Sequence, residues 1–221
     1  MSRPKLTLFL DVVSPFAYMA FYLTEHHRLF KQCDLTIVPI FLGGVMQMCN
    51  NRPPLQIKNK DKWISKERVR WAKQFNIPFA EKNPEPFPQL TLGAMRALCA
   101  VTLMYPNDRA ILSNCFAALY QAFWVERKTI SEPEIYGKIF KDVLGEQKGS
   151  EVMAKSQSKE AKDLLKANTD LAFEEGAFGL PYFVAINTKG EKESFWGFDH
   201  IGQVVDHLGI QRTLQDFKSM L

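Results

Sequence analysis

The sequence is poor in the residues that build redox and metal centres, with four cysteines and four histidines among 221 residues. No two cysteines form a CxxC pair, and the cysteines and histidines lack the spacing of a metal site. We therefore expect neither a protein dithiol nor a bound metal. Cys99 and Cys115 lie in apolar helical segments, where free thiols serve as small core residues in a reducing compartment.

Long apolar runs and a strong charge of one sign are lacking as well. No uninterrupted apolar stretch reaches the length of a membrane span, and the amino end has no apolar signal-peptide core. We therefore expect an intracellular protein without a membrane span. The net charge of +4 allows anionic ligands but is too small for a dedicated nucleic-acid binder, so no nucleic acid is expected as a partner.

What is present is enough apolar sequence for a sizeable core, since 46% of the residues are hydrophobic. The amino end predicts a strand over residues 5–10, a helix over 15–30 with Pro15 in its first turn, and a strand over 35–40. These three elements form a β-α-β unit.

A long helical region follows. Its first part, residues 43–91, is rich in glycine, proline and asparagine and contains one amphipathic helix. Thr91, Asn107 and the capping box that begins at Ser131 mark the starts of later helices. The helices of this region are expected over 60–75, 92–104, 108–125, 131–144, near 150, and over 158–175.

The pattern then returns to strands, over 181–187 and 193–196, followed by helices over 201–207 and 213–220. The order β-α-β, helical block, β-β-α is that of an α/β thioredoxin-like fold with a large all-helical insertion, as in DsbA-like proteins. Residues 1–42 and 176–221 then form a discontinuous thioredoxin-like domain, and residues 43–175 form the helical insertion domain.

Four short segments stand out in order along nearly the whole chain. They are Phe9-Leu10-Asp11-Val12-Val13-Ser14-Pro15-Phe16, Asn51-Arg52-Pro53-Pro54, Gly176-Ala177-Phe178-Gly179-Leu180-Pro181 and Phe195-Trp196-Gly197-Phe198-Asp199. Together these segments resemble kappa-class glutathione transferases, and the related 2-hydroxychromene-2-carboxylate isomerases are the next most similar family. The helical insertion matches in length and pattern more than in sequence.

Ser14 stands at the start of the first helix, where unpaired N–H groups and a partial positive charge stabilise an anion. Thioredoxins place a reactive cysteine there, so any sulfur handled at Ser14 must come from a small molecule. A serine hydroxyl that donates to this sulfur lowers the thiol pKa from about 8.5 toward neutrality. The alternative is that Ser14 serves only as an N-cap.

Pro181 directly precedes a predicted strand, at the place where thioredoxin folds carry a cis proline beside the active turn. The resemblance implies that the main chain of Leu180 pairs with the cysteinyl backbone of glutathione, as an added strand would. The alternative is an ordinary trans proline that opens the strand.

Glutathione carries two carboxylates and one ammonium group, so its site needs cationic or amide donors and one acidic partner. The resemblance implies that Asn51 and Lys60 bind the glycyl carboxylate and that Asp199 holds the γ-glutamyl ammonium; Asp199 can also act as an N-cap. Phe16, Phe198 and His200 depart from the family's usual tyrosine, small polar residue and arginine. The residues assigned to glutathione around a catalytic Ser14 are Pro15, Phe16, Asn51, Lys60, Leu180, Pro181, Phe198, Asp199 and His200.

The resemblance thus implies a glutathione transferase whose thiolate attacks a hydrophobic electrophile or a peroxide, with glutathione as co-substrate. Trp63, Phe87 and Trp124 are candidates for the electrophile pocket or for the core. Alternatives are a glutathione-dependent isomerase and an inactive binding or chaperone module. The resemblance also implies a homodimer and a mitochondrial or peroxisomal location, although the cytoplasm also fits. The tripeptide Ser219-Met220-Leu221 resembles a peroxisomal address only loosely.

Overall fold

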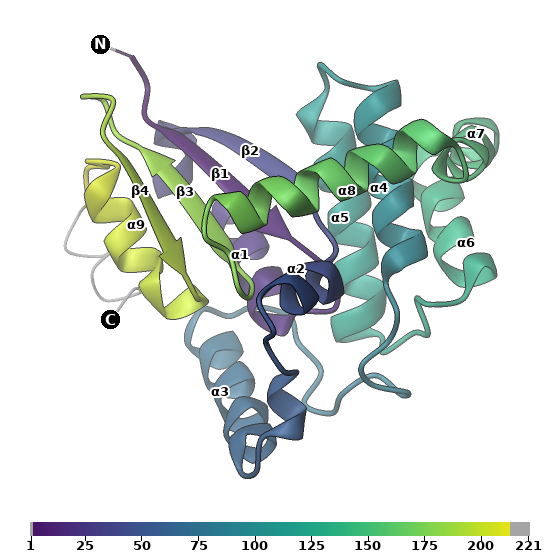
Figure 1. Cartoon of the computed structure of the whole chain (residues 1–221), viewed down its shortest axis with the longest axis horizontal. Coiled ribbons are helices and arrows are strands. Elements are labelled where there is room, and N and C mark those ends of the chain that lie inside the picture. The colour runs from purple at the N-terminus through teal and green to yellow at the C-terminus, as the bar shows by residue number, and fades with distance from the viewer. Residues whose placement is uncertain (1, 213–221) are drawn as a thin grey trace.

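The computed structural model describes residues 2–212. Its centre is a four-stranded mixed sheet with the strand order β2-β1-β3-β4 (Figure 1). The strands are β1 (Lys5–Leu10), β2 (Asp34–Pro39), β3 (Tyr182–Ile186) and β4 (Lys192–Trp196). The predicted β-α-β and β-β-α halves therefore meet in one sheet.

β1 is a central strand that runs parallel to β2 and antiparallel to β3. Leu8 of β1 lies opposite Ile37 on one side and Phe183 on the other, and all three are buried. A parallel pair needs a crossover connection, which here contains α1 (Pro15–His26). The carboxyl end of β1 and the amino end of α1 consequently meet at residues 11–14, the edge at which α/β sheets bind ligands.

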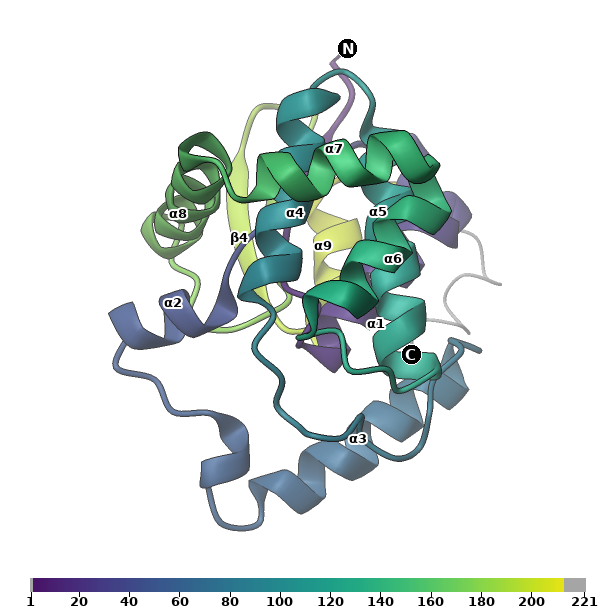
Figure 2. The same ribbon diagram turned by 90° about the vertical axis from the view of Figure 1, so that its right-hand side faces the viewer.

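Helices cover both faces of the sheet. α8 and α2 lie on one face, and α1 and α9 lie on the other, as two perpendicular views show (Figures 1 and 2). Beyond α1, the α-helices of the described residues are α2 (Leu42–Met48), α3 (Lys60–Gln74), α4 (Leu92–Met104), α5 (Arg109–Tyr120), α6 (Pro133–Leu144), α7 (Glu146–Ser156), α8 (Lys159–Glu174) and α9 (Ile201–His207).

Two predicted helices are shorter than the sequence pattern indicated. α1 ends at His26, and a separate 3₁₀ helix, Arg28–Gln32, occupies the rest of the predicted range. The predicted helix over 108–125 divides into α5 and a π-helical turn, Gln121–Val125. Helical periodicity alone does not distinguish these neighbouring types of helix.

The predicted helix starts were correct at some positions and wrong at others. Ser158 caps α8 by accepting a hydrogen bond from the N–H of Ala161. Asp108, not Asn107, caps α5, and the capping box at Ser131 does not form. Glu132 occupies the N-cap position of α6 without a side-chain cap bond, because Pro133 sets the first helical residue there.

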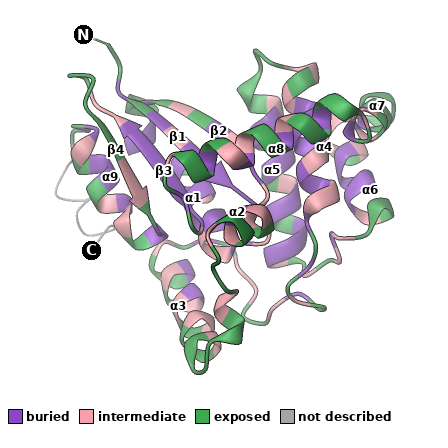
Figure 3. Cartoon of the chain, viewed as in Figure 1, coloured by how far each residue is buried: buried purple, intermediate pink, exposed green. Residues whose placement is uncertain are grey.

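The helical block and the sheet share one continuous core (Figure 3). Rings from α1 and α5 interlock, with Tyr18 stacked on Tyr120 at 5.0 Å and Phe21 tilted against Phe116 at 5.9 Å between ring centroids. Cys99 and Cys115 are buried as predicted, and burial raises the pKa of both thiols to about 12. The proposed division at residues 42/43 and 175/176 stays a prediction.

No helix within residues 2–212 combines the length and the apolar character needed to cross a lipid bilayer. The predicted helix over 213–220 and the Ser219-Met220-Leu221 tripeptide lie outside the described residues.

Candidate functional site

Ser14 is the N-cap residue of α1. Its backbone is extended, with φ −89° and ψ 119°, and its Oγ accepts a hydrogen bond from the N–H of Ala17 at 3.2 Å. Pro15 follows in the first helical turn, as expected for this position. Only 6% of Ser14 is exposed. The hydroxyl is therefore held at the positive end of the helix in a site largely shielded from water.

The same hydroxyl faces the segment that precedes β3. Ser14 Oγ donates to the main-chain carbonyl oxygen of Leu180 at 3.4 Å, and the Leu180–Pro181 peptide bond is cis. The N–H of Leu180 has no hydrogen-bond partner among the described residues. The two sequence markers, Ser14 and Leu180-Pro181, thus lie side by side, and the main-chain N–H of Leu180 forms no bond among the described residues.

The turn between β1 and α1 is held in place by one hydrogen bond from the helical block and one within the turn itself. The indole of Trp124 donates to the carbonyl oxygen of Val12 at 2.8 Å, and the N–H of Ser14 donates to the carbonyl oxygen of Asp11 at 3.2 Å. Trp124 is 1% exposed, so it belongs to the core and supports the turn between β1 and α1 from the side of the helical block.

Asp11 anchors this turn to two other elements. Its carboxylate accepts hydrogen bonds from the Thr91 hydroxyl at 2.7 Å, from the Leu42 N–H at 2.9 Å and from the Val13 N–H at 3.2 Å. The side chain is fully buried, and this burial outweighs the hydrogen bonds and raises its pKa from 3.8 to about 6. Sequence reasoning gave Asp11 no role, although an acidic residue between apolar neighbours was a usable signal.

Asn51 joins the site through the loop before Pro181. Its Nδ2 donates to the carbonyl oxygen of Phe178 at 2.7 Å, and its Oδ1 accepts from the Arg52 N–H at 2.8 Å. The Phe178 ring tilts against Trp196 of β4 at 4.7 Å, and both side chains are partly exposed. This aromatic pair beside Leu180 was part of the sequence motifs but had no predicted role.

The segment over residues 197–200, which precedes α9, is hydrogen-bonded to the Leu180-Pro181 segment. The N–H of Gly197 donates to the carbonyl oxygen of Pro181 at 3.0 Å. Asp199 is exposed, its Oδ1 lies 3.5 Å from Nδ1 of His200, and a Cβ on Gly197 would approach this Oδ1 to 2.5 Å. The carboxylate therefore folds back over Gly197, near the Leu180-Pro181 segment.

Phe198 points into the protein. It is 2% exposed and packs edge-on against Trp71 of α3 and against Phe75, the residue that follows α3, each at 5.4 Å between ring centroids. Its side chain is therefore part of the core, and only its main chain is available to a ligand. A bulky aromatic ring at this position joins α3 to the thioredoxin half of the molecule.

The other predicted site residues are less tightly connected. Phe16 is half-buried in the first turn of α1 and packs against the core. Lys60 is the first residue of α3 and is exposed, and no contact among the described residues joins it to Ser14 or Leu180. The structure thus brings together Ser14, Leu180-Pro181, Asn51 and Asp199 and leaves Lys60 apart.

The candidates for an electrophile pocket occupy three different environments. Trp124 is core, and Phe87 is half-buried against it at 5.6 Å between ring centroids. Trp63 on α3 is 57% exposed. Phe79, which was not among the candidates, stacks on Trp124 at 5.3 Å and is only partly buried.

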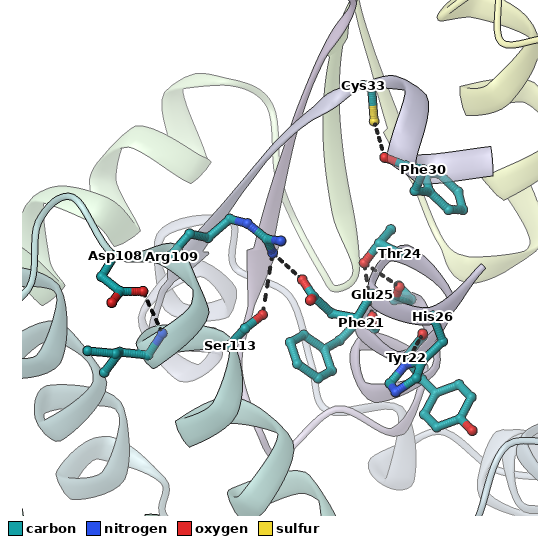
Figure 4. A network of polar contacts seen from close by, with 12 residues as sticks. Phe21, Tyr22, Thr24, Glu25, His26, Phe30, Cys33, Asp108, Arg109 and Ser113 are labelled. Carbon is teal, nitrogen blue, oxygen red and sulfur yellow. Dashed lines mark hydrogen bonds and ion pairs between the residues drawn. The ribbon is translucent and has the colours of Figure 1, made fainter. Parts of the chain in front are cut away.

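A cavity of about 480 Å³ lies at the other end of β1 and is lined by Arg3, Glu25, Cys33 and Arg109, among others. Figure 4 shows the polar network there, in which Arg109 reaches Glu25 and Ser113. Burial raises the pKa of the Cys33 thiol to about 11. Because the charged groups pair with one another and Ser14 lies at the opposite end of the strand, this cavity is separate from the candidate site.

The arrangement at Ser14 suits one kind of chemistry. A hydroxyl donor at a helix amino end favours the anionic form of a thiol placed beside it. The open N–H of Leu180 next to this hydroxyl suits a peptide that contains the thiol, and the Asp199 carboxylate suits an ammonium group. The side chains present therefore fit a thiol peptide that carries a free amino group.

Comparisons with known proteins identify the family and the fold of the chain. The family model described as the DSBA-like thioredoxin domain matches residues 5–209. Glutathione S-transferase kappa 1 of Caenorhabditis elegans is 25% identical over 220 residues, covering 96% of this chain and 94% of that protein. Glutathione s-transferase kappa 2 of the same organism is 28% identical, covering 94% and 92%, and human glutathione S-transferase kappa 1 is 26% identical, covering 91% and 89%.

Solved structures share the fold. A 2-hydroxychromene-2-carboxylate isomerase superposes with a TM-score of 0.73 at 17% identity and covers 93% of this chain and 94% of its own. The cytosolic disulfide reductase DsbM of Pseudomonas aeruginosa with GSH superposes with a TM-score of 0.61 at 13% identity, covering 93% and 96%. The predicted thioredoxin-like α/β fold with its helical insertion is confirmed, as is the resemblance to kappa-class glutathione transferases.

Proposed function

Because the chain belongs to the DSBA-like thioredoxin domain family, we propose that it is a glutathione transferase of the kappa type in which Ser14 holds the glutathione sulfur as a thiolate. The observation that carries this proposal is the position of Ser14 Oγ, at the N-cap of α1 and 3.4 Å from Leu180 O. The kappa-class relatives, which match over almost the whole chain, support the transferase activity.

In this proposal glutathione lies across the Ser14 turn as an additional strand. Leu180 donates its free N–H to the cysteinyl backbone, and Asp199 binds the γ-glutamyl ammonium group. Asn51 and Lys60 bind the glycyl carboxylate, which requires the exposed Lys60 side chain to reach toward the loop that Asn51 already contacts. Pro15 and Phe16 border the sulfur, and His200 stands beside Asp199.

The reaction begins when the Ser14 hydroxyl turns from Leu180 O to the glutathione sulfur. The thiolate attacks an electrophilic carbon of an apolar substrate, a carbon–sulfur bond forms, and either a leaving group departs or an alkene electron pair moves to the next carbon and takes a proton from water. With a peroxide, two glutathione molecules supply the two electrons, and the products are glutathione disulfide, an alcohol and water.

Two other activities of the same fold are distinguished by simple observations. An isomerase would return glutathione unchanged, whereas a transferase consumes it, so the loss of free thiol during turnover separates the two. An inactive binding module would leave the thiol pKa of bound glutathione at its ordinary value near 8.5. Homodimer assembly and a mitochondrial or peroxisomal location remain proposals that rest on the resemblance.

The direct test is a pH titration of glutathione bound to the protein, followed by the ultraviolet absorbance of the thiolate. We expect the pKa of the bound thiol to fall by about one to two pH units and to return toward 8.5 in Ser14→Ala. An ordinary thiol pKa in the parent complex, or equal values in parent and variant, would refute the proposal.

A further inference from the structure

Arg68 of α3 is a buried cation without a full set of partners. Only 3% of the residue is exposed, although arginine is almost never fully buried without a counter-ion. Its Nη2 donates to the main-chain oxygen of Glu81 at 2.6 Å. Its Nε and Nη1 are buried and have no hydrogen-bond partner among residues 2–212. The guanidinium therefore keeps unused donors in a place where water does not reach them.

No carboxylate of the described residues pairs with this charge. Glu67 pairs with Arg70, and the carboxylate of Glu81 lies 3.4 Å from Nζ of Lys73. Burial lowers the pKa of the Arg68 guanidinium from its ordinary value, but an arginine remains protonated at neutral pH. A buried positive charge without a carboxylate is unfavourable, so the binding of an anion beside it lowers the free energy of the folded protein.

The guanidinium also lies against aromatic side chains that contact the turn between β1 and α1. It lies over the Phe79 ring, 5.3 Å from the centroid, and this ring stacks on Trp124. The Trp124 indole in turn binds the carbonyl oxygen of Val12, two residues before Ser14. Arg68 is thus connected to the sulfur site by two aromatic rings and one hydrogen bond.

We propose that Arg68 binds the carboxylate of the second substrate, so that the preferred electrophile is an apolar, aromatic acid. The inference rests on the proposed transferase function and specifies its substrate class. A carboxylate accepts the unused N–H groups of Arg68, and an aromatic body packs against Phe79, whose ring is only partly buried.

The covering segment between α3 and α4, residues 76–91, must move for the acid to enter. It runs back from α3 toward α4 (Figure 2), and Arg68 holds it through Glu81 O. The ring of Phe79 covers the guanidinium from one side, so the entry of a carboxylate displaces Phe79 and not the core ring of Trp124. The alternative is that Arg68 has a structural role alone and only holds residues 76–91 against α3.

The first experiment measures binding and does not depend on catalysis. Isothermal titration compares a non-reactive aryl propionate with its primary amide, in the parent, in Arg68→Leu and in Arg70→Leu. Arg70 lies on the same helix with its side chain 67% exposed, so it controls for loss of a positive charge. We expect the parent and Arg70→Leu to bind the acid about 10- to 100-fold more tightly than the amide, and Arg68→Leu to show no preference.

The second experiment measures glutathione addition to an aryl vinyl ketone that carries a para-carboxylate and to its methyl ester. In the reaction the thiolate sulfur bonds to the terminal alkene carbon, and the displaced electron pair takes a proton from water. Arg68→Leu should lower kcat/KM for the acid about 10- to 100-fold and leave the ester within about twofold of the parent. Arg68→Lys should recover part of the loss, because it keeps the charge without the planar fork.

The outcomes separate the two proposals. Turnover of neither ketone and an ordinary thiol pKa of bound glutathione, together with a binding preference for the acid that depends on Arg68, would refute the transferase function and keep the anion site. Equal losses for acid and ester in Arg68→Leu, or a parent that binds acid and amide alike, would overturn the Arg68 proposal and assign the residue to the support of residues 76–91.

Discussion

The hydroxyl oxygen of Ser14 lies 3.4 Å from the carbonyl oxygen of Leu180, although the two residues are 166 positions apart in the chain. The hydroxyl has one proton, and in the free protein it gives that proton to Leu180 while it accepts the Ala17 N–H. A bound thiolate therefore competes with Leu180 O for the same proton. A hydrogen bond of 3.4 Å is long and therefore weak, so replacing the bond to Leu180 O with one to the thiolate costs little free energy.

Ser14→Ala should separate the catalytic role of the hydroxyl from its role as a helix cap. Ser158 caps α8 in the same way, through a 3.2 Å bond from Ala161 N, and lies in the helical block. We expect each alanine variant to lose about 1 kcal/mol in the free energy of unfolding, measured in urea. Only Ser14→Ala should lower kcat/KM for glutathione transfer, by about 10- to 100-fold. Equal activities in the two variants would leave Ser14 as a cap alone.

Asn51→Ala tests whether the loop before Pro181 must be held for glutathione to bind. The variant removes the 2.7 Å bond from Nδ2 to Phe178 O, two residues from Leu180. We expect KM for glutathione to rise about 10-fold or more with little change in kcat, because the variant loses both this neutral hydrogen bond and the proposed bond from Asn51 to the glycyl carboxylate.

The matched control is Asn187→Ala. Asn187 follows β3 and also bonds locally, with its Oδ1 accepting the Lys189 N–H at 2.9 Å. Its loss should leave KM unchanged. A rise in KM of the same size in both variants would show that the effect comes from general loosening of loops.

Local motifs allowed the sequence to predict that Ser14 begins the first helix and that Pro181 directly precedes a strand. Both motifs consist of neighbouring residues, so they can be recognised without knowledge of long-range contacts. The α/β class and the order of elements followed from periodicity for the same reason. The sequence did not distinguish Arg68 from Arg70. Both lie on one amphipathic helix, and only the packing of residues 76–91 over α3 buries the first and leaves the second exposed.

The sequence likewise did not predict that the Phe198 side chain is buried in the core. An aromatic residue beside Asp199 looks like part of a ligand site when only the motif is considered. Its burial depends on Trp71 of α3 and on Phe75 just after this helix, both more than a hundred positions earlier in the chain. Local sequence patterns do not predict long-range contacts of this kind.

Asp11 should make the stability of the fold depend on pH. Burial raises the pKa of its carboxyl from 3.8 to about 6, so the folded protein holds this proton more tightly than the unfolded chain does. The free energy of unfolding should therefore fall as the pH rises from about 4 to about 6, by up to roughly 3 kcal/mol, and Asp11 should add no further change above that range.

Asp11→Asn removes this titration. Urea unfolding of parent and variant at several pH values should give curves whose difference changes between about pH 4 and pH 6 and is constant above it. The amide nitrogen that this substitution introduces cannot accept a hydrogen bond, so either the Thr91 hydroxyl or the Leu42 N–H loses its acceptor. The variant should therefore be less stable than the parent near pH 4, and this deficit should shrink as the pH rises to about 6, because only the parent then buries a charged carboxylate. Parallel curves across the whole range would show that Asp11 has an ordinary pKa.

Phe198 offers a test of whether its side chain takes part in glutathione binding at all. The ring is 2% exposed and fills the space between Trp71 and Phe75, so Phe198→Ala should cost about 3–5 kcal/mol in the free energy of unfolding. Phe198→Leu keeps most of the volume and should cost less than about 2 kcal/mol. Phe140→Leu, at another fully buried position in α6, serves as the matched control for stability.

The decisive quantity for Phe198 is KM for glutathione in the leucine variant. Because the ring is buried against Trp71 and Phe75, the variant should keep KM within about twofold of the parent, as Phe140→Leu should. A rise in KM of about 10-fold in Phe198→Leu alone would mean that the ring contacts the tripeptide. The Trp71–Phe75 packing would then have to open when glutathione binds, and α3 would move together with the site.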